Sequence, residues 1–118
     1  MLFTNVFSIL SEIKPQNCVI YSFQIPEKQI EKFKADQSAL IGRINDSRKI
    51  PTDYASNRSK GALERSSFDL WAHSVKPLKE FEEKMTEKFE EQDIFVRSSS
   101  LSWEKEAEAY RLKVKLSN

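Results

Sequence analysis

Within residues 109–117, positions 110–116 alternate strictly between apolar and charged side chains. Tyr110, Leu112, Val114 and Leu116 are separated by arginine or lysine at each position between them. Successive side chains of a strand point to opposite sides of a sheet, so this period of two predicts a strand with one buried and one solvated side. A sheet with one buried side needs a covering layer of helices, and this need constrains the rest of the fold.

Three further segments have the character of strands. Residues 2–10 form an apolar run. A secretory targeting signal would have a basic region before such a run, and none is present. We therefore predict that the run is a buried strand. Residues 18–25 alternate, with apolar side chains at the odd positions from 19 onward, and predict a second strand. Residues 94–103 are expected to pair with 109–117, with the polar residues 104–108 as the hairpin connection.

Two stretches have the three-to-four-residue spacing of a helix with one apolar side. The first covers residues 27–44, and the second runs from the serine pair at 66–67 to Phe89. Pro77 lies inside the second stretch and lacks the backbone N–H that a helix interior needs. We therefore expect a kink, or two helices that meet near Ser74.

The remaining stretch, residues 45–62, is rich in residues that favour turns and is predicted to be a mobile loop. The order strand, strand, helix, helix, strand, strand indicates the α+β class. Residues 1–118 are expected to form a single two-layer domain, with an antiparallel sheet of about four strands and the helices on one face. Trp71 and Trp103 are expected to be packing residues. The predicted core also contains Phe33, Leu40, Phe81, Met85, Leu112 and Val114.

Composition narrows the possible functions. The chain has 19 basic and 18 acidic residues, and a formal net charge of +1 argues against a histone-like polyanion binder. One cysteine and one histidine provide neither an internal disulfide nor a zinc cluster, so no metal is expected. The two isolated glycines, Gly42 and Gly61, cannot form a phosphate-binding loop, and we expect no cofactor. No apolar run approaches the ~20 residues that span a bilayer, so we expect a cytoplasmic protein without membrane contact.

Cys18 and His73 are the candidates for catalytic chemistry. Cys18 lies within a predicted apolar strand, where a free cysteine typically acts as a small buried apolar residue. His73 is expected to be a partly exposed helix residue. Neither is part of a recognisable catalytic constellation, so we predict that the protein is not an enzyme.

An acidic segment supplies the leading functional hypothesis. Residues 80–93 contain seven acids and two lysines, while Phe81, Met85 and Phe89 are expected to face the sheet. The acids would then cover the outer side of the helix, where such charges are often only solvated but can also engage a basic patch on another protein. We therefore predict a small non-catalytic protein-binding module, an inhibitor, adaptor or regulator of undetermined oligomeric state. The predicted partner-binding residues are Glu80, Glu83, Glu87, Glu90 and Glu91.

A basic segment supplies the alternative hypothesis. Residues 43–65 contain six basic and three acidic side chains, and Arg111, Lys113 and Lys115 form a row on the last strand. The loop charges are consistent with simple solvation, and basic residues on an edge strand deter aggregation. Alternatively, these cations contact the phosphates of a nucleic acid while Tyr54 stacks on a base. The candidate nucleic-acid-binding residues are Arg43, Arg48, Lys49, Tyr54, Arg58, Lys60, Arg65, Arg111, Lys113 and Lys115.

Overall fold

The computed structural model describes residues 2–45, 48–50 and 63–118, which form three helices and a mixed sheet. The helices are α1 (Leu2–Ile13), α2 (Glu27–Ala35) and α3 (Val75–Glu91). The strands are β1 (Cys18–Ser22), β2 (Leu40–Ile44), β3 (Arg48–Ile50), β4 (Leu63–Ala72), β5 (Phe95–Glu104) and β6 (Ala109–Ser117). The α+β class is confirmed, although the order of elements differs from the predicted one.

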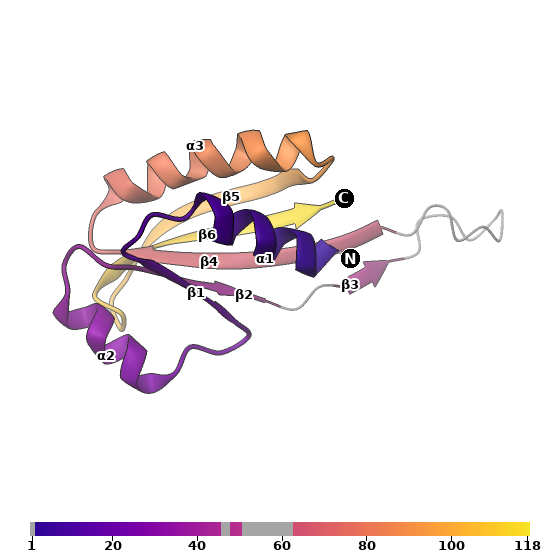
Figure 1. Cartoon of the computed structure of the whole chain (residues 1–118). Helices are drawn as coiled ribbons and strands as arrows, with labels where there is room; N and C mark the ends of the chain where they lie inside the picture. Colours follow the sequence, from indigo (N-terminus) through magenta and orange to yellow (C-terminus); the bar gives the residue numbers. More distant parts are fainter. Residues whose placement is uncertain (1, 46–47, 51–62) are drawn as a thin grey trace, which may run out of the picture.

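Five strands form a continuous path in the order β1-β2-β4-β6-β5, and β3 pairs with β4 beyond the end of β2 (Figure 1). All described pairings are antiparallel except that of β1 with β2, which is parallel. The prediction of an antiparallel sheet of about four strands is therefore wrong in both respects. Parallel neighbours need a crossover connection, and α2 lies in the connection between β1 and β2.

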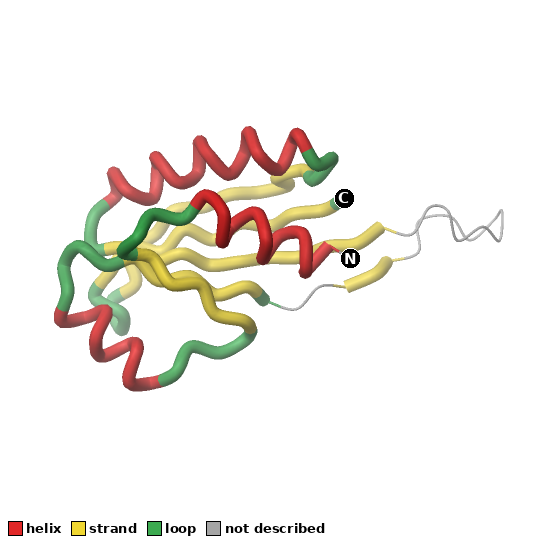
Figure 2. Tube along the Cα trace, in the orientation of Figure 1, coloured by secondary structure: helices red, strands yellow, loops and turns green. Residues whose placement is uncertain are grey.

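The helices lie on both faces of the sheet, and not on one as predicted. Helices α1 and α3 run over one face, while α2 lies on the opposite side near one end (Figures 1 and 2). We call the side under α1 and α3 the helix-covered face and the opposite side the open face. The part of the open face beyond α2 is not covered by any described element.

The main core lies on the helix-covered face. It combines Val6 and Leu10 of α1 with side chains of α3 and alternating residues of β2, β4 and β6. All six predicted core residues are buried. Phe33, however, belongs to a second, smaller cluster under α2 on the open face. The buried members of this cluster are Phe33, Ile41, Trp71 and Ala109.

Residues 2–10 are helical, and the prediction of a strand there is wrong. Val6, Ile9 and Leu10 are buried, and their spacing of three and four brings them to one side of a helix. On a strand, Ile9 and Leu10 would point to opposite faces. The buried positions of this run therefore follow the helical spacing of three and four residues and not the strand period of two. None of the described helices is long and apolar enough to cross a membrane.

The predicted helix 27–44 is a helix followed by a strand. Helix α2 ends at Ala35, and the Asp36 carboxylate then accepts hydrogen bonds from the backbone N–H (3.0 Å) and the hydroxyl (2.8 Å) of Ser38. These bonds lower the pKa of Asp36 and form a local turn that competes with the helix. Leu40 and Ile41 then pack in different clusters, on opposite faces of the sheet, as strand residues do.

The predicted helix that begins near residue 66 is likewise a strand followed by a helix. In β4, Phe68 and Leu70 join the main core, while Trp71 joins the cluster on the open face. The element boundary expected near Ser74 exists, but it joins a strand to a single helix. Pro77 lies in the first turn of α3, where its missing N–H has no intrahelical partner to lose, so it does not divide the helix.

The predicted strand 18–25 is confirmed only in part, because β1 is shorter and both of its sides contact apolar clusters, Ile20 the main core and Tyr21 the cluster under α2. Strand β1 ends at Ser22, its Cys18 is buried and Ile20 packs on the main core, whereas Val19 is exposed. Phe23 is 58% exposed and has a positive φ of 66°. Within the predicted loop 45–62, residues 48–50 form β3, while 46–47 and 51–62 lie outside the described residues. The predicted mobility of this loop therefore stays a prediction.

The C-terminal hairpin is confirmed. Strands β5 and β6 pair, and the turn between them lies at residues 105–108. Two related predictions are wrong. Strand β6 lies between β4 and β5, so its basic row is not on a sheet edge. Trp103 is on the edge strand β5 and is 55% exposed, while Trp71 is buried as expected.

Candidate functional site

The outer side of α3 carries the predicted acidic residues. Leu78, Phe81, Met85 and Phe89 are buried against the sheet, and the apolar stripe thereby fixes the opposite side of the helix toward solvent. Five glutamates lie exposed on the helix, and we call them the acidic face: Glu80, Glu83, Glu87, Glu90 and Glu91.

Few acids of the acidic face are ion-paired, although α3 carries four lysines beside its six glutamates. Its one ion pair with the described part of the chain joins Lys88 Nζ to Glu91 Oε2 at 3.7 Å, and both side chains are exposed. The neighbouring Glu82 points toward the sheet edge and accepts a hydrogen bond from the Ser99 hydroxyl at 2.8 Å. The acidic face therefore presents negative charge to solvent from a helix whose other side is anchored in the core.

The structure brings together part of the predicted basic set. Arg43, Arg65, Arg111, Lys113 and Lys115 alternate with core residues on neighbouring strands, so all five lie on the open face. The side chains of Arg48 and Lys49, and the whole of Tyr54, Arg58 and Lys60, lie outside the described residues. Of the predicted basic surface, the structure therefore describes the strand residues but not the side chains of the loop residues.

Asp69 organises two of these arginines. It is buried on β4, and its carboxylate forms ion pairs with Arg43 Nη2 at 2.9 Å and Arg111 Nη2 at 3.0 Å. Asn45 Nδ2 donates to the same carboxylate at 3.2 Å, and Arg111 Nη1 also pairs with Glu104 Oε2 at 3.0 Å. Two of the five cations are therefore held by internal acids.

Trp71 completes this network. The guanidinium carbons of Arg43 and Arg111 lie over its ring, at 5.3 and 5.2 Å from the ring centroid. Burial alone would lower the pKa of Arg111, but the charge and hydrogen bonds of Asp69, together with Glu104, outweigh it and raise that pKa. Arg111 therefore stays charged, and the ion-pair and cation–π contacts hold both arginine side chains in place.

The remaining cations of the open face are exposed. Arg65, Lys113 and Lys115 form no ion pair with the described residues, and Arg97, which the sequence analysis did not select, joins them from β5. Arg97 Nε donates to the hydroxyl of Ser117 and its guanidinium lies 5.4 Å from the centroid of Phe95. Asp69 and Arg97 were missed because they are single charges within strands, although the alternation from Ser67 to Ala72 is a signal for β4.

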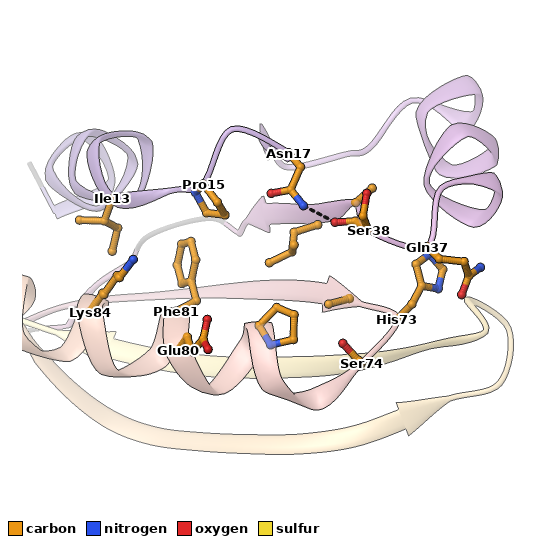
Figure 3. Close-up of a pocket in the computed structure, with 14 residues that line it drawn as sticks. Ile13, Pro15, Asn17, Gln37, Ser38, His73, Ser74, Glu80, Phe81 and Lys84 are labelled. Atoms are coloured by element: carbon orange, nitrogen blue, oxygen red, sulfur yellow. Dashed lines mark hydrogen bonds between the residues drawn. The ribbon is translucent and has the colours of Figure 1, made fainter.

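A hollow of about 380 Å³ lies beside the start of α3 (Figure 3). His73, Glu80 and Lys84 line it from one side, and Asn17 and Ser38 from the other. The side-chain amide of Asn17 donates to the Ser38 carbonyl oxygen across the top of the hollow. The hollow thus combines polar groups from α3 and from three connections between elements.

His73 and Cys18 do not form a reactive pair. His73 lies before α3 rather than on it; its Nε2 is 2.7 Å from the Phe33 carbonyl oxygen, and its ring stacks on Phe33 with centroids 4.3 Å apart. The Cys18 thiol is buried, and this burial raises its pKa to about 12. A protonated, buried thiol is a poor nucleophile. In the described part of the chain, no three His, Cys, Asp or Glu side chains are arranged to hold a metal ion.

Comparison of the chain with models of known protein families and with curated proteins finds no match. The candidate functions therefore rest on the two charged surfaces described above. The acidic face and the open face lie on opposite sides of the sheet (Figure 1).

Proposed function

We propose that the protein is a non-catalytic protein-binding module, an inhibitor, adaptor or regulator, which binds a basic partner through the acidic face of α3. The observation that carries this proposal is the set of exposed glutamates, most of them without an ion pair among the described residues, on a helix whose opposite side is buried. Glu83, Glu87 and Glu90 form no ion pair within the described residues. Their charge is therefore available to a partner.

The anchoring of α3 supports the same proposal. Phe81, Met85 and Phe89 are almost fully buried, so the helix cannot roll to hide its acids. Acids on a fixed helix need little ordering of the backbone when a partner binds. An excess of acidic over basic side chains also accelerates the approach of a basic protein, and this acceleration weakens as salt screens the charges.

The test begins with affinity capture from a nuclease-treated lysate of the source organism. A captured protein is purified, and its association rate is measured with the wild-type chain and with the triple variant Glu83→Lys, Glu87→Lys, Glu90→Lys. The association rate of the variant is expected to fall about tenfold or more, because charge complementarity acts mainly on the encounter step. Circular dichroism checks that the variant is folded.

A matched control reverses three exposed glutamates elsewhere: Glu27→Lys, Glu31→Lys and Glu106→Lys. The net charge changes equally, so the control separates a local contact from the overall field. The control is expected to keep the wild-type association rate within about twofold. The proposal fails if both variants lose the partner equally, if the α3 variant keeps it, or if no protein is captured from the nuclease-treated lysate.

One observation favours nucleic-acid binding as a second candidate function. Arg65, Arg97, Lys113 and Lys115 are exposed on the open face, beside the serines of β5. Exposed cations and hydroxyl groups are the side chains that contact phosphates. If they bind a single strand, the affinity for a labelled oligothymidine should fall with salt, with a log–log slope of about −0.7 for each phosphate contact. Absence of binding at low salt would remove this candidate.

A further inference from the structure

The two edges of the sheet are unequal. The edge strand β1 has five residues and shares a pocket lining with α2, whereas the edge strand β5 has ten residues. Strand β5 pairs with β6 on one side, and no other strand in the described part of the chain pairs with its second side. The N–H and C=O groups directed to that second side form a long template for another strand.

Few of the usual protective features are present on β5. Natural edge strands are blunted by short length, proline, lysine or a bulge. Strand β5 contains no proline and no lysine, and its one irregularity lies between Val96 and Ser98. From Ser98 to Glu104 it pairs with β6 in an unbroken register. This seven-residue stretch can therefore accept a neighbour without a local distortion.

The two sides of this edge differ in chemistry. On the helix-covered side, Leu101 lies opposite Leu112 and is 37% exposed, and Trp103 is 55% exposed. The Trp103 ring is fixed by an edge-to-face contact with Tyr110, with centroids 5.0 Å apart. An added strand could cover this exposed apolar surface, and its burial would favour binding.

On the open side, the edge is small and polar with cations behind it. Ser98 lies opposite Lys115 and Ser100 lies opposite Lys113, so each serine stands between a lysine and the free edge. Neighbouring strands are ~4.8 Å apart, and a lysine side chain is long enough to extend over a serine toward the next strand. Both lysines are exposed and form no ion pair with the described residues.

We infer that the free edge of β5 binds an extended segment of another protein as an added strand. The segment carries apolar side chains at alternate positions, packed beside Leu101 and Trp103, and acidic side chains between them, directed toward Lys113 and Lys115. Backbone hydrogen bonds would supply affinity, and the alternating side chains would supply specificity. This surface is separate from the acidic face of α3, so the inference does not rest on the proposed function.

The test uses two short peptides, one alternating valine with glutamate and the other valine with lysine. Binding to the full chain is followed by hydrogen exchange and by tryptophan fluorescence, to which the edge residue Trp103 contributes together with Trp71. We expect the glutamate peptide to protect the amides of residues 98–104 and to bind about tenfold more tightly than the lysine peptide.

Two variants and two controls locate the site. Leu101→Lys places a charge on the exposed apolar side of the edge. This variant is expected to bind the glutamate peptide about tenfold more weakly than the wild type. The pair Lys113→Glu, Lys115→Glu should reverse the preference between the two peptides. Arg65→Glu changes a cation on the same face but on β4, and is expected to keep the preference. The triple α3 variant described above should bind the glutamate peptide like the wild type.

Three outcomes would overturn the inference. One is the absence of protection at residues 98–104 when the peptide is at saturating concentration. Another is an unchanged peptide preference in the Lys113→Glu, Lys115→Glu variant. The last is a self-associated protein, seen by sedimentation, in which these amides are already protected without peptide, since a second copy would then occupy the edge.

Discussion

The two faces of the sheet are built from the same strands but are stabilised differently. On the helix-covered face, apolar side chains from α1, α3 and four strands form one continuous core. On the open face, a small cluster under α2 is followed by the Asp69 network and then by exposed cations. The alternation of each strand thus allows one face to determine the fold while the other carries charge. The comparison predicts unequal responses to substitution on the two faces.

The largest effect is expected on the helix-covered face. Phe81→Ala should lower the free energy of unfolding by about 3–5 kcal/mol, through lost burial and a residual cavity. Phe95→Ala is the matched control, because Phe95 is 44% exposed at the sheet edge, and it should cost less than about 1 kcal/mol. Urea unfolding followed by circular dichroism measures both. Equal decreases in the free energy of unfolding for the two variants would show that the position of a phenylalanine on the helix-covered face does not determine its contribution to stability.

Substitution of Asp69 should have the next largest effect. Asp69→Asn leaves Arg43 and Arg111 without their buried counter-charge. Loss of one partner of a buried pair costs 3–5 kcal/mol, and the partial exposure of both arginines reduces our expectation to about 2–3 kcal/mol. Glu104→Gln, at a half-buried site of the same network, should cost less than about 1 kcal/mol. If the two variants are equally stable, Asp69 does not organise the open face.

Alkaline pH should weaken the helix-covered face through Cys18. Its pKa is raised from 9.0 to about 12 in the folded protein, so between these values the unfolded chain loses the proton first. Stability from this group is complete below pH 9 and falls as the pH rises toward 12. At pH 10 the loss should be about 1.4 kcal/mol relative to pH 8.

The Cys18→Ala variant isolates this effect from other groups that titrate at alkaline pH. Between pH 8 and pH 10, the free energy of unfolding should decrease in both proteins. The decrease in the variant should be about 1.4 kcal/mol smaller than in the wild type. Parallel pH dependence of the two proteins would mean that Cys18 is not protected by the fold.

The smallest effect is expected from the exposed lysines of the open face. Lys113→Gln and Lys115→Gln should each change the free energy of unfolding by less than about 0.5 kcal/mol, since neither side chain has a partner among the described residues. Thermal unfolding compared with the wild type is sufficient. A loss comparable to that of Asp69→Asn would extend the stabilising network across the whole face.

The sequence predicted the elements whose period is long and unbroken. The C-terminal hairpin and the buried stripe of α3 belong to this group, and both determine charged surfaces on their opposite sides. The predicted elements are wrong at residues 2–10, 40–44 and 66–72. A short apolar run fits both the helical period of about 3.6 residues and the strand period of two. Whether it becomes a helix or a strand then depends on its contacts with the rest of the fold.

The Asp69 network could not be predicted from the sequence, for a different reason. Asp69 lies between Phe68 and Leu70, and its partners Arg43 and Arg111 are 26 and 42 positions away in the chain. These separations are closed by the pairing of β4 with β2 and β6, which the sequence pattern did not specify. A single charge in an apolar run gives no indication of its partner.

The position of β5 has a consequence for the order of folding. The β5–β6 hairpin is local in sequence and can form within microseconds, whereas β4 must pair with β6 across the whole of α3 and β5. Until β4 arrives, both sides of the hairpin are open. Docking of β4 then closes only the β6 side. We therefore expect the outer side of β5 to be accessible from the earliest hairpin to the finished protein, so that a binding segment could engage it while the rest of the sheet is still assembling.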